Sequence, residues 1–246
     1  MSKLPCFEGE AYGRWKPDAP PVEIQVQATE PHGFRGGLFL SNDPASSPSS
    51  KQALRDAIVG ARLRLAPGER AARSRDIASR LVSLAPWARA GTIGLYSPMG
   101  AEVDTSDLAA AAAAAGKRVA FPRLSGGERA LSFAICAPGD LVPGDLRTRE
   151  PPPGAPALPV SDLDLVLVPG VAFDLGCRRL GRGRGHYDAT LARLRGGATR
   201  IGLAFELQIV PQVPFEPHDV TLDAVVTEAR VLFPLPAAGA PGNSSH

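Results

Sequence analysis

The chain has 246 residues, of which 44% are hydrophobic, and its formal net charge is +2. This length and composition fit a globular protein with a buried core, while the near-neutral charge argues against a general nucleic-acid binder. Because no apolar run reaches the roughly 18 residues that a membrane span needs, and the N-terminus has no signal or transit pattern, we expect a cytoplasmic protein without a membrane partner.

Residues 1–50 are rich in Pro, Gly and Ser, a composition that resists compact packing. Within them, Val22–Gln27 alternates with period two, as an edge strand does. The tail, residues 236–246, is rich in Ala, Gly, Pro and Ser, and we expect it to be disordered. The expected division is therefore an irregular extension over residues 1–50, a folded domain over residues 51–235 and a flexible tail over residues 236–246.

Two helices are expected before the first strand. Ser50 is a suitable N-cap for the first helix, whose apolar residues recur at helical spacing until the Pro67–Gly68 stop. Glu69 opens the second helix, which ends at Pro86. Its inner side is expected to carry the apolar residues Ile77, Leu81, Val82 and Leu84.

A β-α-β unit follows these helices. Thr92–Tyr96 has the pattern of a short buried strand, Ser106–Gly116 that of a helix ending in a C′ glycine, and Arg118–Phe121 that of a second strand closed by Pro122. Such a unit predicts parallel strands joined by a right-handed crossover. Further strands are expected at Leu131–Ile135, Leu163–Val168, Arg200–Phe205 and Asp223–Thr227.

The order of these elements predicts an α/β fold, in which a mostly parallel central sheet is flanked by helices within a single domain. Residues 163–168 are a near-continuous apolar run, which is typical of a central parallel strand buried on both faces. The proline-rich connection over residues 138–159 is long for a compact domain and suggests a wall or lid of a site.

Three charged residues in this region have both a plain and a functional interpretation. Lys51 and Arg55 lie four residues apart on one face of the first helix, and from spacing alone that face is a solvated one. Glu102 follows the first strand, at the sheet edge where open α/β folds place ligands. Its plain interpretation is an ordinary exposed carboxylate.

The most distinctive stretch is a glycine- and arginine-rich loop, Arg179–Asp188, between a buried strand and a helix. Alternating glycines let the backbone present N–H groups while guanidinium groups project between them, so a polyphosphate is the expected guest. The spacing G-x-G-x-G matches neither a Walker A loop nor a dinucleotide fingerprint. The alternative is a surface loop whose glycines only permit a chain reversal.

Asp188 and Asp219 are candidates for holding Mg²⁺ beside phosphate, because this ion takes one or two carboxylates and fills its shell with water and phosphate oxygens. Asp188 could instead be a simple helix N-cap. The three cysteines and four histidines show no metal-ligand spacing, so neither a zinc site nor a disulfide framework is expected.

Several segments together resemble the 5-formyltetrahydrofolate cyclo-ligase family, also called 5,10-methenyltetrahydrofolate synthetase. The resemblance covers residues 51–233, and its most specific part is the RLGxGxGxYD pattern ending at Asp188. The other matching segments, in order, are Lys51–Arg55, Tyr96–Asp104, Phe121–Pro122, Glu150–Pro151, Val168–Asp174 and Glu216–Glu228.

The resemblance implies an ATP- and Mg²⁺-dependent ring closure that converts 5-formyltetrahydrofolate into 5,10-methenyltetrahydrofolate and releases ADP and phosphate. It implies a metal site at Asp188 and Asp219, and substrate contacts from Ser97, Met99, Glu102 and His186. Arg182 and Arg184 are assigned to neutralising charge on the transferred phosphoryl group. The implied ATP-binding residues are Lys51, Arg55, Arg179, Gly181, Arg182, Gly183, Arg184, Gly185, His186 and Tyr187.

One residue departs from the family pattern. Two tyrosines usually precede the aspartate, but this chain has His186 followed by Tyr187. A histidine can stack or donate a hydrogen bond, and it adds a titratable group near phosphates. The readings that remain open are a non-catalytic nucleotide- or RNA-binding relative and an ATP-using ligase for another amide. We expect a monomer or weak dimer acting on small molecules.

Overall fold

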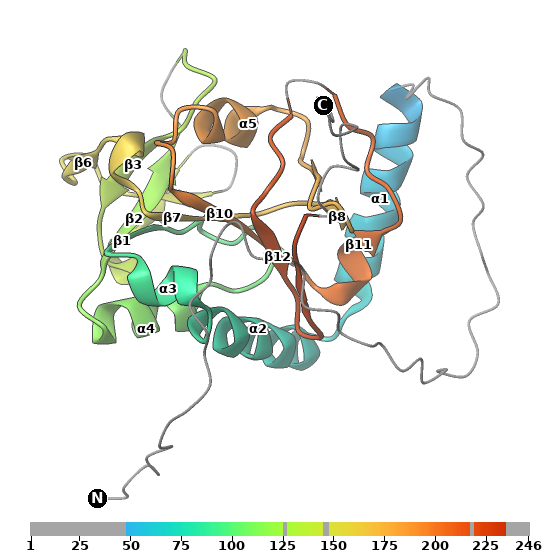
Figure 1. Ribbon diagram of the computed structural model, residues 1–246, viewed down its shortest axis with the longest axis horizontal. Helices are drawn as coiled ribbons and strands as arrows, with labels where there is room; N and C mark the ends of the chain where they lie inside the picture. Colours follow the sequence, from blue (N-terminus) through green and yellow to red (C-terminus); the bar gives the residue numbers. More distant parts are fainter. Residues whose placement is uncertain (1–47, 125–126, 145–147, 217–218, 235–246) are drawn as a thin grey trace, which may run out of the picture. The chain divides into compact units, whose positions relative to one another are not determined.

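A computed structural model describes residues 48–124, 127–144, 148–216 and 219–234. The predictions for Val22–Gln27 and for the tail lie outside these residues. Within them, one central sheet has eight strands (Figure 1). In spatial order these are β13 (Val231–Leu232), β12 (Ala224–Val226), β10 (Thr199–Leu203), β7 (Leu165–Val168), β1 (Thr92–Gly94), β2 (Arg118–Arg123), β3 (Ser132–Ile135) and β6 (Ala157–Leu158).

The middle of this sheet is parallel, as predicted. β12, β10, β7, β1 and β2 pair in parallel with one another, and β1 and β2 are joined through α4 (Ser106–Ala114). Gly116 has a φ of 66° after the end of α4, which confirms the predicted C′ glycine. The two edges of the sheet are antiparallel, since β13, β3 and β6 each run against their neighbours.

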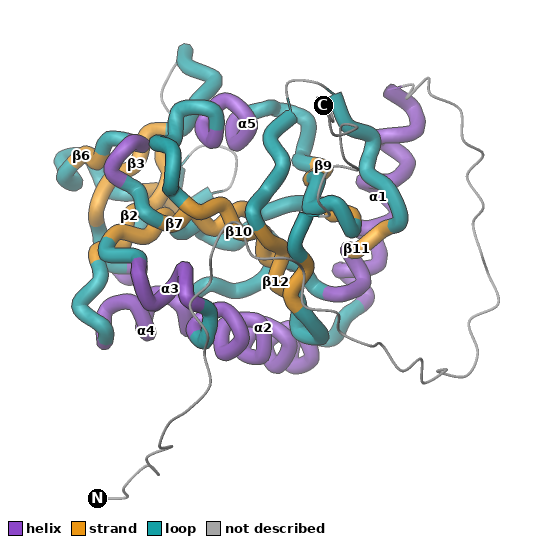
Figure 2. Tube along the Cα trace, in the orientation of Figure 1, coloured by secondary structure: helices purple, strands orange, loops and turns teal. Residues whose placement is uncertain are grey.

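Helices cover both faces of the sheet. Figures 1 and 2 show α2 (Pro67–Val82), α3 (Ala85–Arg89) and α4 on one face and α5 (His186–Leu191) on the other. α1 (Pro48–Arg64) lies apart from both layers, beside β8 (Ala172–Asp174). The α/β class with a mostly parallel, helix-flanked central sheet is therefore confirmed.

Strand β7 explains why the central run of the sequence is apolar at every position. Its side chains alternate between the two faces, and all four are fully buried. Leu165 and Leu167 pack into the core beneath α2 and α4, whereas Val166 and Val168 pack into the core on the α5 side. Because both faces are covered, no position of β7 can be polar.

Two helix starts, the exposure of one side chain and one additional helix differ from the prediction. α1 begins at Pro48, so Ser50 is inside the helix and is not its N-cap. α2 begins at Pro67, which occupies the first helical turn, where a missing N–H costs nothing; the Pro-Gly pair starts a helix instead of only ending one. Val82 was expected on the inner side of α2 but is 38% exposed. α3 was not predicted.

The strand and loop predictions also need two corrections. β2 continues through Pro122, which is opposite Phe133 of β3; β1 has already ended, so no neighbour on that side needs an N–H from residue 122. The proline-rich connection is not a plain loop, because it contains short elements. These are η1 (Pro138–Asp140), β4 (Val142–Pro143), β5 (Arg149–Glu150) and β6, with η3 (Val160–Asp162) directly after it.

A second, small sheet was not anticipated and is the element that delivers the glycine- and arginine-rich loop. Its order is β11 (Ile209–Val210), β8 and β9 (Arg179–Leu180), and η4 (Glu206–Gln208) precedes β11. α1 packs on it through Leu54 and Ile58. The N-terminal helix and the loop after β9 are thereby brought together.

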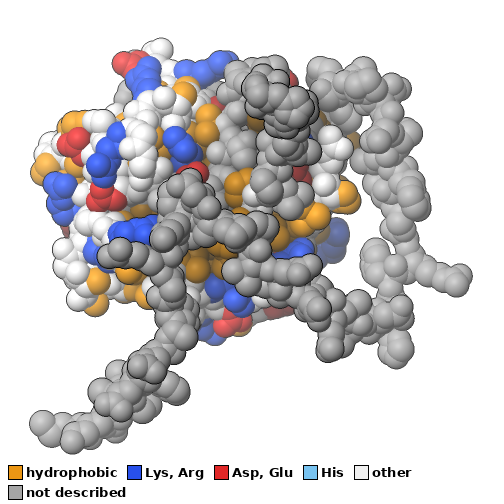
Figure 3. Space-filling model, in the orientation of Figure 1, with side chains coloured by type: hydrophobic (Ala, Val, Ile, Leu, Met, Phe, Trp, Pro, Cys, Tyr) orange, Lys and Arg blue, Asp and Glu red, His pale blue; other side chains and the backbone are white. Residues whose placement is uncertain are grey.

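The surface of the described residues carries charges of both signs. Figure 3 shows basic and acidic side chains interspersed over one face, in keeping with the small net charge of the chain. Within the described ranges, no helix combines the length and apolar character needed to cross a membrane.

Candidate active site

A cavity of about 1020 Å³ lies at the carboxyl ends of β1 and β7. Tyr96 and Ser97 follow β1 into its wall, and Pro169 and Gly170 follow β7. This is the edge at which open α/β sheets hold ligands. Every residue predicted for the site lines this one cavity: Lys51, Arg55, Ser97, Met99, Glu102, Arg179, Gly181, Arg182, Gly183, Arg184, Gly185, His186, Tyr187, Asp188 and Asp219.

The glycines of the loop have conformations that the sequence pattern anticipated. Gly183 and Gly185 have φ values of 91° and 68°, which L side chains rarely adopt. A Cβ atom at Gly181 would lie 2.6 Å from a guanidinium nitrogen of Arg179. Gly185 is the N-cap of α5, so Asp188 lies in the first turn of the helix and is not its cap.

The two basic residues of α1 point into the site, so the solvated-face interpretation is wrong. Arg55 donates from Nε to the carbonyl oxygen of Gly181 at 3.0 Å, which ties α1 to the loop. The Lys51 ammonium forms an ion pair with Glu216. Glu216 in turn exchanges two hydrogen bonds with Asp219, in which each backbone N–H is used. Three distant segments of the sequence therefore meet at one wall.

Glu102 is not an exposed loop carboxylate, because its side chain is only 7% exposed. Its Oε1 accepts from Nη2 of Arg182 at 2.8 Å, and its Oε2 accepts from the N–H of Met99 at 2.9 Å. The arginine itself is 45% exposed. The ion pair thus links a buried carboxylate in the loop after β1 to a long, half-exposed side chain of the glycine- and arginine-rich loop.

Asp188 forms an ion pair with Arg179, with Nη2 and Oδ1 2.8 Å apart, and Arg179 also lies over the ring of Tyr187. Asp188 and Asp219 both face the cavity. Among the described residues, no three His, Cys, Asp or Glu side chains are grouped to hold a metal ion. Two carboxylates still fit Mg²⁺, which completes its shell with water and phosphate oxygens.

Cations outnumber acids around the cavity. Seven Lys and Arg side chains line it against five Asp and Glu side chains, and Arg129 and Arg184 form no ion pair with any described residue. An anionic guest would relieve the repulsion between these guanidinium groups.

Burial also shifts the pKa values of two tyrosines and one arginine at the site. Burial, and then the Glu102 carboxylate, raise the pKa of Tyr187, so its hydroxyl remains protonated at neutral pH. Burial likewise raises the pKa of Tyr96, which donates to the Val103 carbonyl oxygen. Burial lowers the pKa of Arg62, whose guanidinium donates to the carbonyl oxygen of Gly170.

Several lining residues were not predicted for the site. Glu150 belongs to a segment that resembles the family, yet nothing local to its sequence indicated that it faces the cavity. Arg129 and Arg149 lie in connections without a recognisable motif, and only the pairing of β2 with β3 and of β4 with β5 brings them to the cavity.

Comparison with known proteins gives a consistent result. The model of the 5-formyltetrahydrofolate cyclo-ligase family matches residues 47–228. The chain is 32% identical over 194 residues to the 5-formyltetrahydrofolate cyclo-ligase of Mycolicibacterium smegmatis, covering 77% of this chain and 99% of that protein. It is 35% identical over 173 residues to the enzyme of the same name from Escherichia coli K12, covering 68% and 94%.

Solved structures agree with these sequence matches. The Aquifex aeolicus 5,10-methenyltetrahydrofolate synthetase is similar with a TM-score of 0.68 and 29% identity, over 80% of this chain and 98% of that chain. The Mycoplasma pneumoniae 5,10-methenyltetrahydrofolate synthetase is similar with a TM-score of 0.61 and 26% identity, over 72% and 98%.

Proposed function

The chain belongs to the 5-formyltetrahydrofolate cyclo-ligase family, a family of ligases, and from this we propose that it uses ATP and Mg²⁺ to close 5-formyltetrahydrofolate to 5,10-methenyltetrahydrofolate. The observation that carries the proposal is one cavity, which α1, the loop after β1, the Arg179–Asp188 loop and the residues Glu216 and Asp219 line together. Its excess of cations suits a polyphosphate, and its buried carboxylate suits a ligand with N–H donors.

The proposed chemistry starts from the poor leaving ability of a formamide oxygen. The formyl oxygen attacks the γ-phosphorus of ATP, the bond to the β-phosphate oxygen breaks, and ADP leaves. N10 then attacks the activated formyl carbon and loses its proton. Cleavage of the carbon–oxygen bond releases phosphate and leaves the N5–C–N10 methenyl bridge. Such a transfer depends on positioning and on charge stabilisation more than on covalent help from the protein.

The residues of this chain supply those two needs. Lys51, Arg55 and the N–H groups of the glycine loop bind the phosphates, and Arg182 and Arg184 neutralise the charge that develops on the phosphoryl group. Glu102 accepts hydrogen bonds from the folate.

Asp188 and Asp219 would hold the magnesium ion, which supplies positive charge to the phosphate oxygens when it is bound. Both carboxylates line the cavity beside groups assigned to the phosphates, because Asp188 lies in the first turn of α5 and Asp219 is hydrogen-bonded to the Glu216 that pairs with Lys51.

The reaction is tested by mixing the protein with ATP, Mg²⁺ and 5-formyltetrahydrofolate and following the absorbance of the methenyl product. We expect product only when all three are present, with one ADP formed per product. A folded protein that makes no product in the complete mixture would reject the proposal. Product formed without ATP would reject its energy source.

We also propose that residues 51–235 form the catalytic unit, because the family model begins at residue 47. Removal of residues 1–45 is expected to leave turnover and thermal stability unchanged. A large loss of either would show that the extension takes part in the folded enzyme.

A further inference from the structure

Arg129 is one of the lining residues that neither the sequence pattern nor the proposed chemistry accounts for. It lies in the connection between β2 and β3, and its guanidinium covers Gly185, where an added Cβ would be 3.5 Å from Nε. The side chain faces the cavity and has no ion-pair partner among the described residues. Its position over Gly185 adds a further cation to the lining of the site.

Three contacts hold this segment against α5 and the residues directly after it. The carbonyl oxygen of Arg129 lies 2.7 Å from Nδ1 of His186, which therefore bears the proton in this contact. The N–H of Leu131 donates to the hydroxyl of Thr190 at 2.8 Å, and that hydroxyl donates to the carbonyl oxygen of His186 at 2.7 Å. Glu128 adds an exposed ion pair with Arg193. Arg129 is fixed between these contacts.

The central contact depends on the residue that departs from the family pattern. A tyrosine at position 186 has no donor at the place of Nδ1, because its only hydroxyl is at the far end of the ring. The histidine ring bonds the backbone close to its own Cβ instead. In this chain position 186 therefore fixes the β2–β3 connection over the loop.

Resting on the function proposed above, we propose that Arg129 is an anion-binding residue of the cavity, held in place by His186, and that it takes an oxyanion group of one substrate. A guanidinium presents a planar fork that fits both a phosphate and a carboxylate. The two sources are a phosphate of ATP and a carboxylate of the glutamate portion of the folate.

The test is direct binding of ATP and of 5-formyltetrahydrofolate, each titrated by calorimetry into the full chain and into Arg129→Met. We expect the Kd of one ligand to rise about tenfold, the loss of a charge-assisted hydrogen bond, while the other changes by less than twofold. A rise for ATP assigns the contact to phosphate, and a rise for the folate assigns it to carboxylate.

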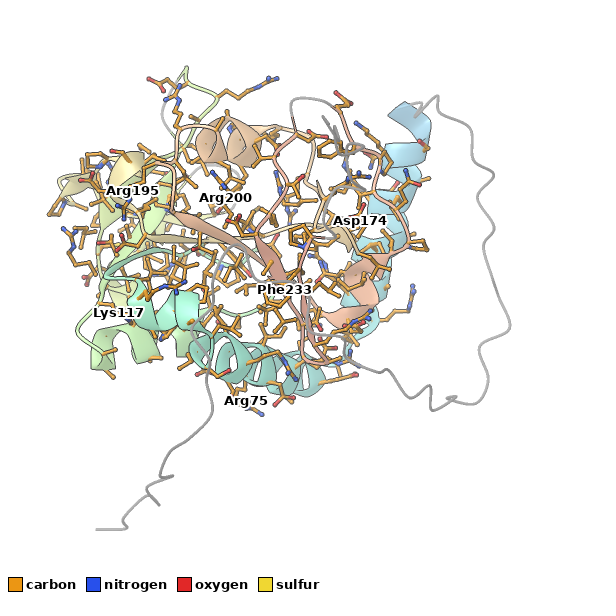
Figure 4. All side chains as sticks on the ribbon, viewed as in Figure 1. Arg75, Lys117, Asp174, Arg195, Arg200 and Phe233 are labelled. Atoms are coloured by element: carbon orange, nitrogen blue, oxygen red, sulfur yellow. The ribbon has the colours of Figure 1, made fainter. Side chains whose placement is uncertain are left out.

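His186→Phe keeps the ring and removes the hydrogen bond. It should weaken the binding of the same ligand, but by less than Arg129→Met does. In the double variant it should cause no further loss of binding, because both residues act through one guanidinium. Additive losses would overturn the link to His186. Arg75→Met is the matched control: Figure 4 shows Arg75 on the outer side of α2, away from α5, and its binding should equal that of the wild type.

The possible failures can be told apart. Wild-type protein that binds neither ligand overturns the proposed function and this inference together. Wild-type binding that Arg129→Met leaves unchanged overturns only the role of Arg129. An equal loss for both ligands, accompanied by a lower thermal midpoint, also overturns it, because the residue would then stabilise the fold rather than meet an anion.

Discussion

The guanidinium of Arg182 donates hydrogen bonds from Nη2 and from Nε to Oε1 of Glu102, at 2.8 and 3.2 Å. This ion pair links the loop expected to bind ATP with the wall expected to bind the folate. Its two members differ in exposure, since the carboxylate is buried and the arginine is half-exposed. The arginine is therefore the member that can turn toward a phosphate while the carboxylate stays in place.

Glu102→Gln tests this division. The amide keeps the shape but has no charge and can no longer accept at both atoms, so binding of folate N–H groups weakens. We expect kcat/KM for 5-formyltetrahydrofolate to fall about tenfold to a hundredfold, with the KM for ATP changed less than threefold. Asp76→Asn, at an exposed site of α2, serves as the control. Equal effects on both substrates would contradict the assignment.

Asp188→Asn tests the metal assignment. The amide retains an acceptor for Arg179 but is a weaker ligand for a hard cation. Turnover should fall at least about tenfold, and the Mg²⁺ concentration for half-maximal rate should rise. Steady-state rates at varied Mg²⁺ and fixed ATP measure both. If the turnover and the Mg²⁺ requirement of the variant both equal those of the wild type, Asp188 serves only to orient Arg179.

Asp174 is a buried carboxylate that takes no part in the proposed chemistry but joins two walls of the site. It is 3% exposed; Oδ1 accepts from the N–H groups of Gly176 and Arg178 at 2.9 and 3.0 Å, and Oδ2 accepts from Val213 at 3.1 Å. It is the last residue of β8, and Figure 4 shows it next to α1. It thus fixes the turn before β9 to the segment that leads to Glu216.

Asp174→Asn directs an N–H₂ group at backbone donors, whichever way the amide is turned. We expect a loss of about 2–3 kcal/mol in the free energy of unfolding, measured with denaturant, and a higher KM for ATP. The KM for the folate should change less, because the displaced segments carry the phosphate-binding groups. A stable variant with unchanged KM values would contradict this role.

Asp164 gives a prediction for pH. Burial disfavours its charge, but hydrogen bonds from the N–H groups of Thr92 and Gly91, at 2.8 Å each, and the nearby Arg195 outweigh that effect and lower its pKa. Figure 4 shows Arg195 at the β3 side of the sheet. A carboxyl whose pKa is lower in the folded state stabilises the protein above its unfolded pKa of about 3.9, and this contribution is lost as the pH falls through the folded value.

Asp164→Asn should therefore lower the thermal midpoint by roughly 2–4 °C at pH 7, a modest shift because both partners are partly exposed. The difference from the wild type should shrink below about pH 3.9 and vanish at lower pH. Thermal unfolding followed at several pH values measures it, and a difference that stays constant down to acid pH would exclude the electrostatic cause.

The parts of the fold that were predicted correctly depend on local chemistry. The apolar run of β7 and the C′ glycine after α4 are specified by a few neighbouring residues. The strand β3 was predicted, but the edge strands β13 and β6 were not, because two-residue strands exist only through their partners. The proline in β2 obscured its true length, since its tolerance depends on where β1 ends.

The site shows the same division. Its glycine- and arginine-rich loop was predicted because its residues are contiguous in the sequence. The ion pair between Lys51 and Glu216 joins segments 165 residues apart, and no local pattern indicates it. Arg129 was not predicted for a similar reason, because its place over Gly185 results from the pairing of β3 with β2 and from the hydrogen bond to His186.

The transfer of the γ-phosphoryl group to the formyl oxygen is the central claim, and the fate of that oxygen tests it most directly. The measurement is turnover of 5-formyltetrahydrofolate labelled with ¹⁸O in the formyl group, followed by mass analysis of the phosphate released. The account predicts one ¹⁸O atom in each phosphate, because the carbon–oxygen bond breaks after the oxygen has bonded to phosphorus. Unlabelled phosphate, with the label found in water, would contradict it.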